Sequence, residues 1–157
     1  MRIRQLALVA QSLTPLVQNL QSVFSLGEGF TDPGVSTFGL TNCVLPVGDS
    51  FLEVVSPTQD GTTAGRLLAR RGGDGGYMVI VQVDGPDLNL IQERERMKGL
   101  GVRIVFDHAV QSIATIHLHP RDVGAAILSL DCAQPPPSWH WAGPEWETRC
   151  RADVTHG

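Results

Sequence analysis

The sequence lacks the features that mark several large classes of protein. Acidic residues (16) outnumber basic residues (12) and the net charge is −4, so the chain has no excess of positive charge with which to bind nucleic acid. The apolar run at residues 6–10 is too short to span a bilayer, and no cleavable hydrophobic region precedes a small-residue site. We therefore expect no signal peptide and no contact with nucleic acid or membrane. The chain has three cysteines, Cys43, Cys132 and Cys150. An odd number of cysteines without metal-ligand spacing indicates free thiols in the cytoplasm.

The composition that remains is that of an ordinary globular protein. Hydrophobic residues make up 42% of the 157 residues and charged residues 18%. A chain of this length can form one domain or two small modules that pack together.

The first half of the chain predicts a β-α-β-β unit. Apolar residues between Leu13 and Phe24 recur at the i, i+3, i+4, i+7 spacing of an amphipathic helix, and Gly27 and Gly29 end it. A further short strand is expected near Phe30. The expected elements are a strand at 3–11, a helix capped by Ser12 or Thr14 that ends before Gly27, strands at about 36–46 and 49–55, and a linker at 57–76 with a short helix at about 63–71.

The second half repeats this pattern at a nearly constant offset in residue number, which indicates duplication of one supersecondary unit. We expect the side chains of Leu90, Ile91 and Met97 to point inward from its helix. The expected elements are a strand at 77–83, a helix at 86–99, a strand after Val102, and strands at 113–119 and 124–131. The predicted domain boundaries are a first module at 3–56, the linker at 57–76, a second module at 77–131 and a Pro- and Trp-rich tail at 132–157.

Three short motifs give the chain a resemblance to a known superfamily. They are residues 51–54 (FLEV) followed by Ser56-Pro57, residues 64–68 (AGRLL) before Gly75-Gly76, and residues 119–124 (HPRDVG) leading into 127–130 (ILSL). With the duplicated modules, they resemble the vicinal oxygen chelate superfamily of glyoxalases, bleomycin-resistance proteins, dioxygenases and epimerases. The epimerase branch, or an unassigned glyoxalase-like group beside it, is the nearest. The resemblance implies an α+β fold, two paired β-α-β-β-β modules that form a curved sheet around a cleft, in a homodimer.

The resemblance also implies four metal-ligand positions, on the first and last strand of each module. Gln5 and Glu53 stand at two of them and offer oxygen ligands. The other two hold Met78 (or Tyr77) and Ser129, and neither methionine nor neutral serine is a good ligand for a hard divalent ion. The expected cofactor is therefore either none or a divalent metal, and we predict no high-affinity metal site of the usual kind.

Glu53 lies in the middle of a short apolar strand and is the first candidate for catalysis. Strand side chains alternate between faces, so a carboxylate here is buried and needs a partner. One interpretation makes Glu53 a general base or metal ligand at the bottom of the cleft. The other makes it a structural carboxylate paired with Arg4, Arg66 or Arg103.

His117 is the second candidate for catalysis. His117 and His119 alternate with Ala114, Ile116 and Leu118, so the strand would place both imidazoles on one face. We predict that His117 lines the cleft, where it could act as an electrophile. His119 either binds ligand or belongs to the turn that Pro120 begins.

The remaining candidates for ligand binding are Asn42, Phe51, Arg66, Trp139 and Trp141. The two tryptophans form either a lid over the cleft or a segment that packs on an apolar surface or a partner subunit. The sequence thus predicts an isomerase or lyase that abstracts a proton next to a carbonyl of a small molecule. The alternatives are a metal-free binding protein of the bleomycin-resistance type and a diverged module with a structural role.

Overall fold

The structure is a computed structural model that describes all residues except 86–87, 89, 111, 125 and 148–157. Its strands form one mixed sheet in the order β2-β3-β1-β4-β7-β6-β5. The parallel pair β4–β7 and the antiparallel pairs β2–β3, β5–β6 and β6–β7 make the sheet mixed. The predicted α+β class is confirmed. The chain forms two compact units, which we call the Glu53 unit (Leu6–Tyr77 with the chain from Trp141 onward) and the His117 unit (Met1–Gln5 with Met78–His140).

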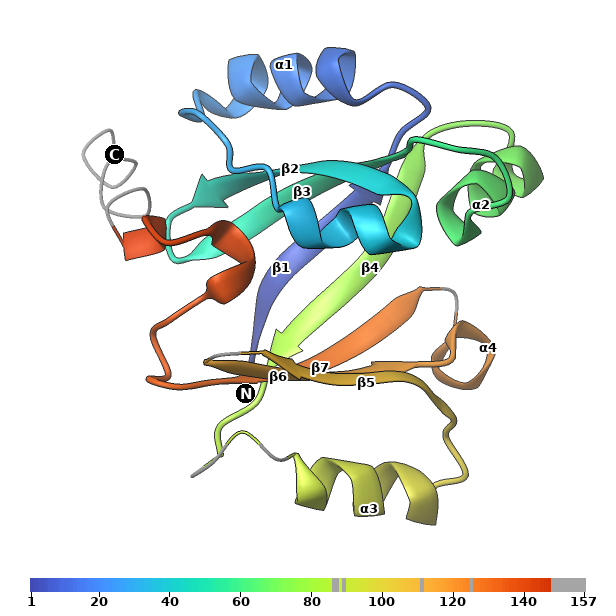
Figure 1. Ribbon diagram of the computed structural model, residues 1–157, viewed down its shortest axis with the longest axis vertical. Helices are drawn as coiled ribbons and strands as arrows, with labels where there is room; N and C mark the ends of the chain where they lie inside the picture. The colour runs from blue at the N-terminus through green and yellow to red at the C-terminus, as the bar shows by residue number, and fades with distance from the viewer. Residues whose placement is uncertain (86–87, 89, 111, 125, 148–157) are drawn as a thin grey trace. The chain divides into compact units, whose positions relative to one another are not determined.

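The elements of the first half of the chain follow the predicted order (Figure 1). They are β1 (Arg2–Val9), α1 (Leu13–Phe24), η1 (Pro33–Phe38), β2 (Leu40–Val47), β3 (Ser50–Pro57) and α2 (Thr63–Arg71). Phe30 makes an isolated bridge to Val44, where a short strand was expected. The expected strand start at residue 36 is wrong, because residues 33–38 form a 3-10 helix. Asp32 begins this helix by accepting a hydrogen bond from the backbone N–H of Gly34, and Pro33 supplies a helical φ.

Helix α2 shows how local sequence sets an element's bounds. The hydroxyl of Thr62 accepts a hydrogen bond from the backbone N–H of Gly65 at 3.0 Å and caps the amino end. Gly72 ends the helix in the left-handed region, with φ 82°, which glycine adopts without steric cost. The predicted bounds of this helix are therefore confirmed.

The Glu53 unit has a core between η1, α2 and one face of β2 and β3. Residues opposite each other in an antiparallel pair share a face, so Asn42 and Val55 lie on the same side of the sheet, as do Val44 and Glu53. On this side the buried core comprises Val9, Leu40, Val55, Ala64 and Leu68, with Val35, Leu67 and Tyr77 packed against it. Glu53 thus lies on the side of β3 that carries this core. Helix α1 also packs against β2 and β3 (Figure 1).

The second half of the chain contains β4 (Gly75–Gln82), α3 (Ile91–Gly99), β5 (Ile104–Val110), β6 (Ile113–Leu118), α4 (Pro120–Val123), β7 (Ile127–Ala133) and η2 (His140–Ala142). Helix α4 was not expected, and residues 86, 87 and 89 of the expected helix lie outside the described residues, as does Cys150. The predicted module boundaries and the cleft between modules stay predictions.

The core of the His117 unit lies between α3 and one face of its strands. It comprises Val83, Leu90, Met97, Ala114, Ile116, Leu118, Leu130 and Cys132. Leu90 and Met97 point inward as predicted, but Ile91 is 58% exposed, so the prediction for Ile91 is wrong. Leu90 precedes α3 and has a left-handed backbone conformation (φ 50°), so helical spacing does not set its inward position. Ile91 and Met97 are both in α3 and lie about one and two-thirds turns apart, so they face different directions.

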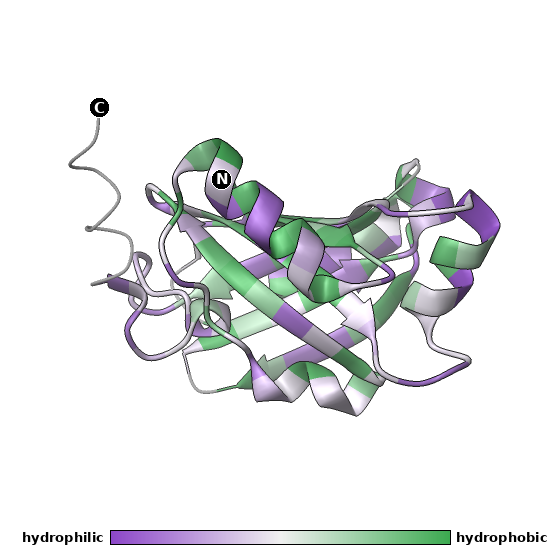
Figure 2. Cartoon of the chain, turned by 90° about the horizontal axis from the view of Figure 1, so that it is seen from above, coloured by the Kyte–Doolittle hydropathy of each residue, from purple (hydrophilic) through white to green (hydrophobic). Residues whose placement is uncertain are grey.

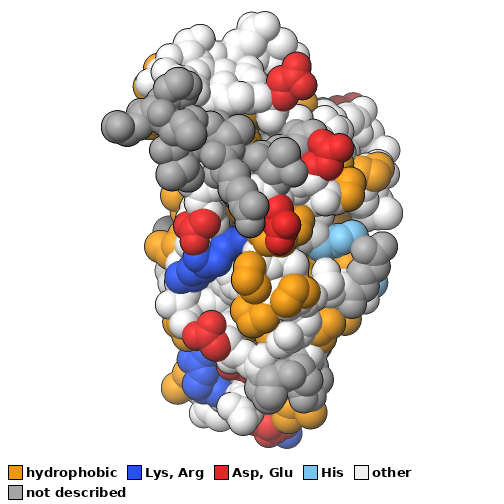
Figure 3. All heavy atoms as spheres, turned by 90° about the vertical axis from the view of Figure 1, so that its left-hand side faces the viewer, with side chains coloured by type: hydrophobic (Ala, Val, Ile, Leu, Met, Phe, Trp, Pro, Cys, Tyr) orange, Lys and Arg blue, Asp and Glu red, His pale blue; other side chains and the backbone are white. Residues whose placement is uncertain are grey.

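Hydrophobic residues dominate the strands, whereas the helices alternate between hydrophobic and hydrophilic residues (Figure 2). On the face drawn in Figure 3, hydrophobic side chains lie among acidic ones, and the few basic side chains lie beside acidic ones. Within the described ranges, no helix has the length and apolar character needed to cross a membrane.

Candidate functional site

Glu53 and Asn42 form a buried polar pair on the η1 side of the sheet. Glu53 is 7% exposed and Asn42 is 1% exposed. The side-chain amide of Asn42 donates a hydrogen bond from Nδ2 to Oε1 of Glu53 at 2.6 Å. The Asn42 carbonyl oxygen accepts the backbone N–H of Asp32 at 2.8 Å. Because a backbone N–H can only donate, this second bond sets which end of the amide faces Glu53. The start of η1 therefore orients the carboxylate through Asn42.

Tyr77 lies in the same unit, at the beginning of β4, and packs against the apolar core that contains Val55. Burial raises the pKa of the Tyr77 phenol, the negative charge of Glu53 raises it further, and the positive charge of Arg66 opposes both. The phenol is therefore protonated at neutral pH. Within the described part of the chain, no group forms a hydrogen bond with its hydroxyl, so that hydroxyl is an available donor.

Arg66 and Arg103, two of the arginines considered as partners of Glu53, bond elsewhere. The Arg66 guanidinium donates to the carbonyl oxygen of Gly61 at 2.5 Å and to the hydroxyl of Thr63 at 3.0 Å. Arg103 pairs with Asp122 in the His117 unit. Of the other ligand-binding candidates in the Glu53 unit, Phe51 is 2% exposed and belongs to the core, and Trp141 is half-buried.

His117 lies on β6 between Phe106 of β5 and Ser129 of β7, opposite the face that packs against α3. Its ring centroid is 4.7 Å from that of Phe106. Burial lowers the pKa of His117 to about 4, so the imidazole is uncharged at neutral pH. Glu53 and His117 belong to different units, and their joint action stays a prediction.

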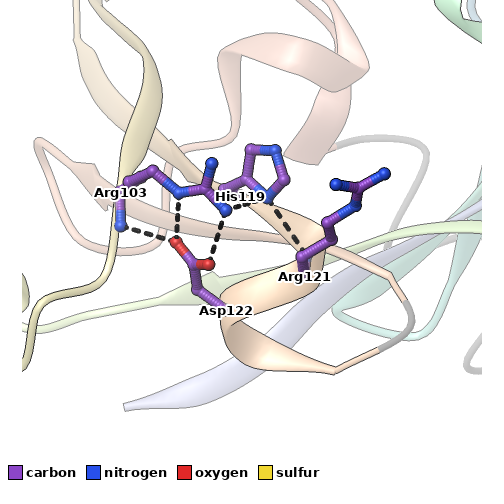
Figure 4. A network of polar contacts seen from close by, with 4 residues as sticks. All are labelled: Arg103, His119, Arg121 and Asp122. Atoms are coloured by element: carbon purple, nitrogen blue, oxygen red, sulfur yellow. Dashed lines mark hydrogen bonds and ion pairs between the residues drawn. The ribbon is translucent and has the colours of Figure 1, made fainter.

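His119 is found in the turn, which was one of its two interpretations (Figure 4). It caps α4, and its Nδ1 accepts the backbone N–H of Arg121 at 3.1 Å and lies 3.1 Å from Nη2 of Arg103. Arg103 also donates to both carboxylate oxygens of Asp122, from Nη2 at 2.7 Å and from Nε at 2.8 Å. These hydrogen bonds hold the pKa of Asp122 well below its usual range. The network fastens the β6–β7 connection to Arg103, and ligand binding by His119 stays a prediction.

Trp139 is completely buried inside the His117 unit. Its indole Nε1–H donates to Oε1 of Gln5 at 2.7 Å, and the guanidinium carbon of Arg4 lies 5.3 Å from the centre of its ring. Arg4 also donates to the carbonyl oxygen of Pro137 at 2.8 Å. Trp139 therefore packs against Gln5 and Arg4 of β1, and both interpretations of the two tryptophans stay predictions.

The side chains at the four implied metal-ligand positions do not fit a hard divalent ion. Gln5 accepts a hydrogen bond from Trp139, and Met78 offers a thioether, a soft donor. The hydroxyl of Ser129 donates to Asp131 and lies 2.9 Å from that of Thr115, which donates to the same carboxylate oxygen at 2.8 Å. Among the described residues, no group of three or more His, Cys, Asp or Glu side chains is placed to hold a metal ion. No step of the proposed reaction is therefore assigned to a metal.

The sequence analysis considered Tyr77 only as an alternative to Met78 at an implied metal-ligand position, and it missed the buried network around Asp131. The signal for Asp131 was the same as for Glu53, a carboxylate in an apolar strand. Tyr77 gave no such signal, because its position beside a charged group depends on the packing of β4 and α2 against β3.

The fold is the glyoxalase-like fold that the resemblance of the sequence implied. The chain is similar to a methylmalonyl-CoA epimerase from Streptomyces coelicolor, solved in complex with 2-nitronate-propionyl-CoA, with a TM-score of 0.74 and 18% identity over 88% of this chain and 99% of that one. It is also similar to the methylmalonyl-CoA epimerase from Mycobacterium tuberculosis, with a TM-score of 0.70 and 15% identity over 84% and 87%.

A hypothetical protein from Bacillus halodurans is similar too, with a TM-score of 0.70 and 16% identity over 83% of this chain and 93% of that chain. The sequence matches no family model and no curated protein.

Proposed function

We propose that this chain is an isomerase or lyase of the glyoxalase type, in which Glu53 removes a proton from the carbon next to a carbonyl of a small molecule. The observation that carries this proposal is the buried Glu53 carboxylate, held in one orientation by Asn42. A general base needs a defined position relative to the C–H bond that it breaks, and a fixed hydrogen bond to one oxygen supplies it. The methylmalonyl-CoA epimerases that share the fold support a reaction of the isomerase class.

The reaction follows from this geometry. The Glu53 carboxylate takes the proton, and the electrons of the C–H bond form a carbon–carbon double bond while the carbonyl electrons move to its oxygen. The result is an enolate and a protonated Glu53. Delivery of a proton from water to the opposite face of the same carbon, with the proton on Glu53 released to water, inverts the carbon and completes an epimerisation. Loss of a leaving group from the neighbouring carbon would instead complete an elimination.

The test is exchange of the α-hydrogen in deuterated water, with methylmalonyl-CoA as the first probe and simpler acyl thioesters as further probes. Nuclear magnetic resonance would follow the loss of the proton signal. We expect exchange with the unaltered protein and a decrease of about 10²–10⁴-fold in Glu53→Gln, which keeps the shape of the side chain and removes the base. Glu95→Gln, at an exposed glutamate on α3, is the matched control. Full exchange in Glu53→Gln would contradict the assignment of the base.

The second candidate function is that of a metal-free binding protein of the bleomycin-resistance type. The poor metal donors at the implied metal-ligand positions, among them Gln5 and Ser129, favour this second function. Tight binding of the probe without hydrogen exchange, equal in the unaltered protein and in Glu53→Gln, would select this function over catalysis.

A further inference from the structure

An enolate places negative charge on the former carbonyl oxygen, and an enzyme must stabilise that charge. In the described residues no metal-ligand set can do so, as shown above. The stabilising group has to be a hydrogen-bond donor or a cation close to Glu53, because the oxygen and the α-carbon of the ligand are only two bonds apart.

Tyr77 meets these requirements within the Glu53 unit. It packs against the core on the side of β3 that carries both Val55 and Glu53, since these two residues are two apart on one strand. The charge of Glu53 acts directly on its phenol. Its hydroxyl forms no hydrogen bond within the described ranges, whereas the amide of Asn42 is used at both ends and the guanidinium of Arg66 bonds to Gly61 and Thr63.

We propose that the Tyr77 hydroxyl donates a hydrogen bond to the carbonyl oxygen of the ligand from which Glu53 takes a proton, and that it stabilises the enolate in the role a metal would have. This proposal rests on the proposed function. The Tyr77 proton stays on the phenol throughout, while the proton of the substrate carbon moves to Glu53 and its electron pair to the carbonyl oxygen. The donor is suited to this role because it packs on the core that lies on the Glu53 side of β3 and its hydroxyl has no hydrogen-bond partner in the described part of the chain.

The position of Tyr77 relative to Glu53 can be tested without any ligand. Tyr77 is the single tyrosine of the chain, so the ultraviolet absorbance of tyrosinate reports on this residue alone. We expect a pKa above 10.0 in the unaltered protein, a lower value in Glu53→Gln because a negative charge is removed, and a higher value in Arg66→Gln because a positive charge is removed. The control Glu95→Gln should leave the titration unchanged. A titration that is the same in Glu53→Gln and in the unaltered protein would overturn the proposal.

The functional test is Tyr77→Phe, which keeps the ring that packs against the core and removes only the hydroxyl. We expect kcat for hydrogen exchange to fall by about 10²–10³-fold, the usual loss for one oxyanion donor, with a much smaller change in KM. The affinity for 2-nitronate-propionyl-CoA, whose anionic group imitates an enolate, should fall in the same variant. Thermal unfolding would show that the variant is folded.

The outcomes separate this proposal from the proposed function. If the unaltered protein exchanges hydrogen and Glu53→Gln does not, but Tyr77→Phe keeps full kcat, the function stands and the role of Tyr77 is overturned. If the unaltered protein exchanges no hydrogen, the proposed function fails. In that case equal affinity of the unaltered protein and Tyr77→Phe for the nitronate, or no binding by either, overturns the role of Tyr77 as well.

Discussion

His117 is an imidazole that burial keeps uncharged, and the consequence is a specific dependence of stability on pH. Its pKa is about 4 in the folded protein and 6.5 in an unfolded chain. Between these pH values the unfolded chain binds a proton at this imidazole and the folded protein does not. The contribution of uncharged His117 to the stability of the fold is therefore complete above pH 6.5 and is lost as the pH falls towards 4. The slope from this group is at most about 1.4 kcal/mol per pH unit.

The prediction is that His117→Asn reduces the acid sensitivity of the protein. The free energy of unfolding, measured with urea at several pH values, should fall by about 2–3 kcal/mol less in the variant than in the unaltered protein between pH 6.5 and 4. His108→Asn is the matched control, because His108 is exposed and lies near the same Phe106 ring, with centroids 5.8 Å apart. The same pH dependence in all three proteins would show that His117 is protonated in the folded state.

At the scale of elements, the segment after β7 belongs to the core of the His117 unit rather than to a detachable tail. The backbone N–H of Gln134 donates to the carbonyl oxygen of Ser112 at 2.7 Å, and Nε2 of Gln82 donates to that of Pro136 at 2.5 Å. Trp139 then fills the interior and bonds to Gln5. Since Gln5 is on β1, this segment connects the two ends of the chain.

The prediction for this segment is that Trp139→Ala costs about 3–5 kcal/mol of stability, the usual loss for a large buried aromatic side chain. Trp146→Ala is the matched control and should cost less than about 1 kcal/mol, because Trp146 is only partly buried. Urea unfolding of the two variants gives both values. Removal of residues 133–157 should then unfold the His117 unit, and a truncated chain that stays fully stable would contradict the assignment of Trp139 to the core.

At the scale of the whole molecule, the described side chains at the metal-ligand positions that the resemblance implies do not form a suitable donor set. We predict that protein purified without chelators contains less than one equivalent of divalent metal and that hydrogen exchange is unaffected by a chelator. Glu53→Gln is analysed in parallel. One equivalent of metal in the unaltered protein, absent from this variant, would contradict the prediction and would require ligands beyond the four implied positions.

The sequence by itself determined the features that depend on local preferences and on repeating patterns. The bounds of α2 followed from a threonine cap and a terminal glycine, and the inward positions of Leu90 and Met97 were expected from their apolar character. The burial of Glu53 followed from strand alternation in an apolar run. Repetition of the pattern in the second half was sufficient to indicate the superfamily fold.

Only the tertiary structure decided which side chains became partners. Trp139 and Gln5 are 134 residues apart, and no local rule connects an indole in a proline-rich segment with an amide on the first strand. Tyr77 likewise packs on the core that lies on the Glu53 side of β3 because separate elements meet there. Local propensity acts over a few residues, whereas burial and hydrogen bonding are satisfied by whichever groups the folded chain brings together. For that reason the sequence predicted the buried carboxylate, whereas the tyrosine that we propose as its partner in the reaction became apparent only in the fold.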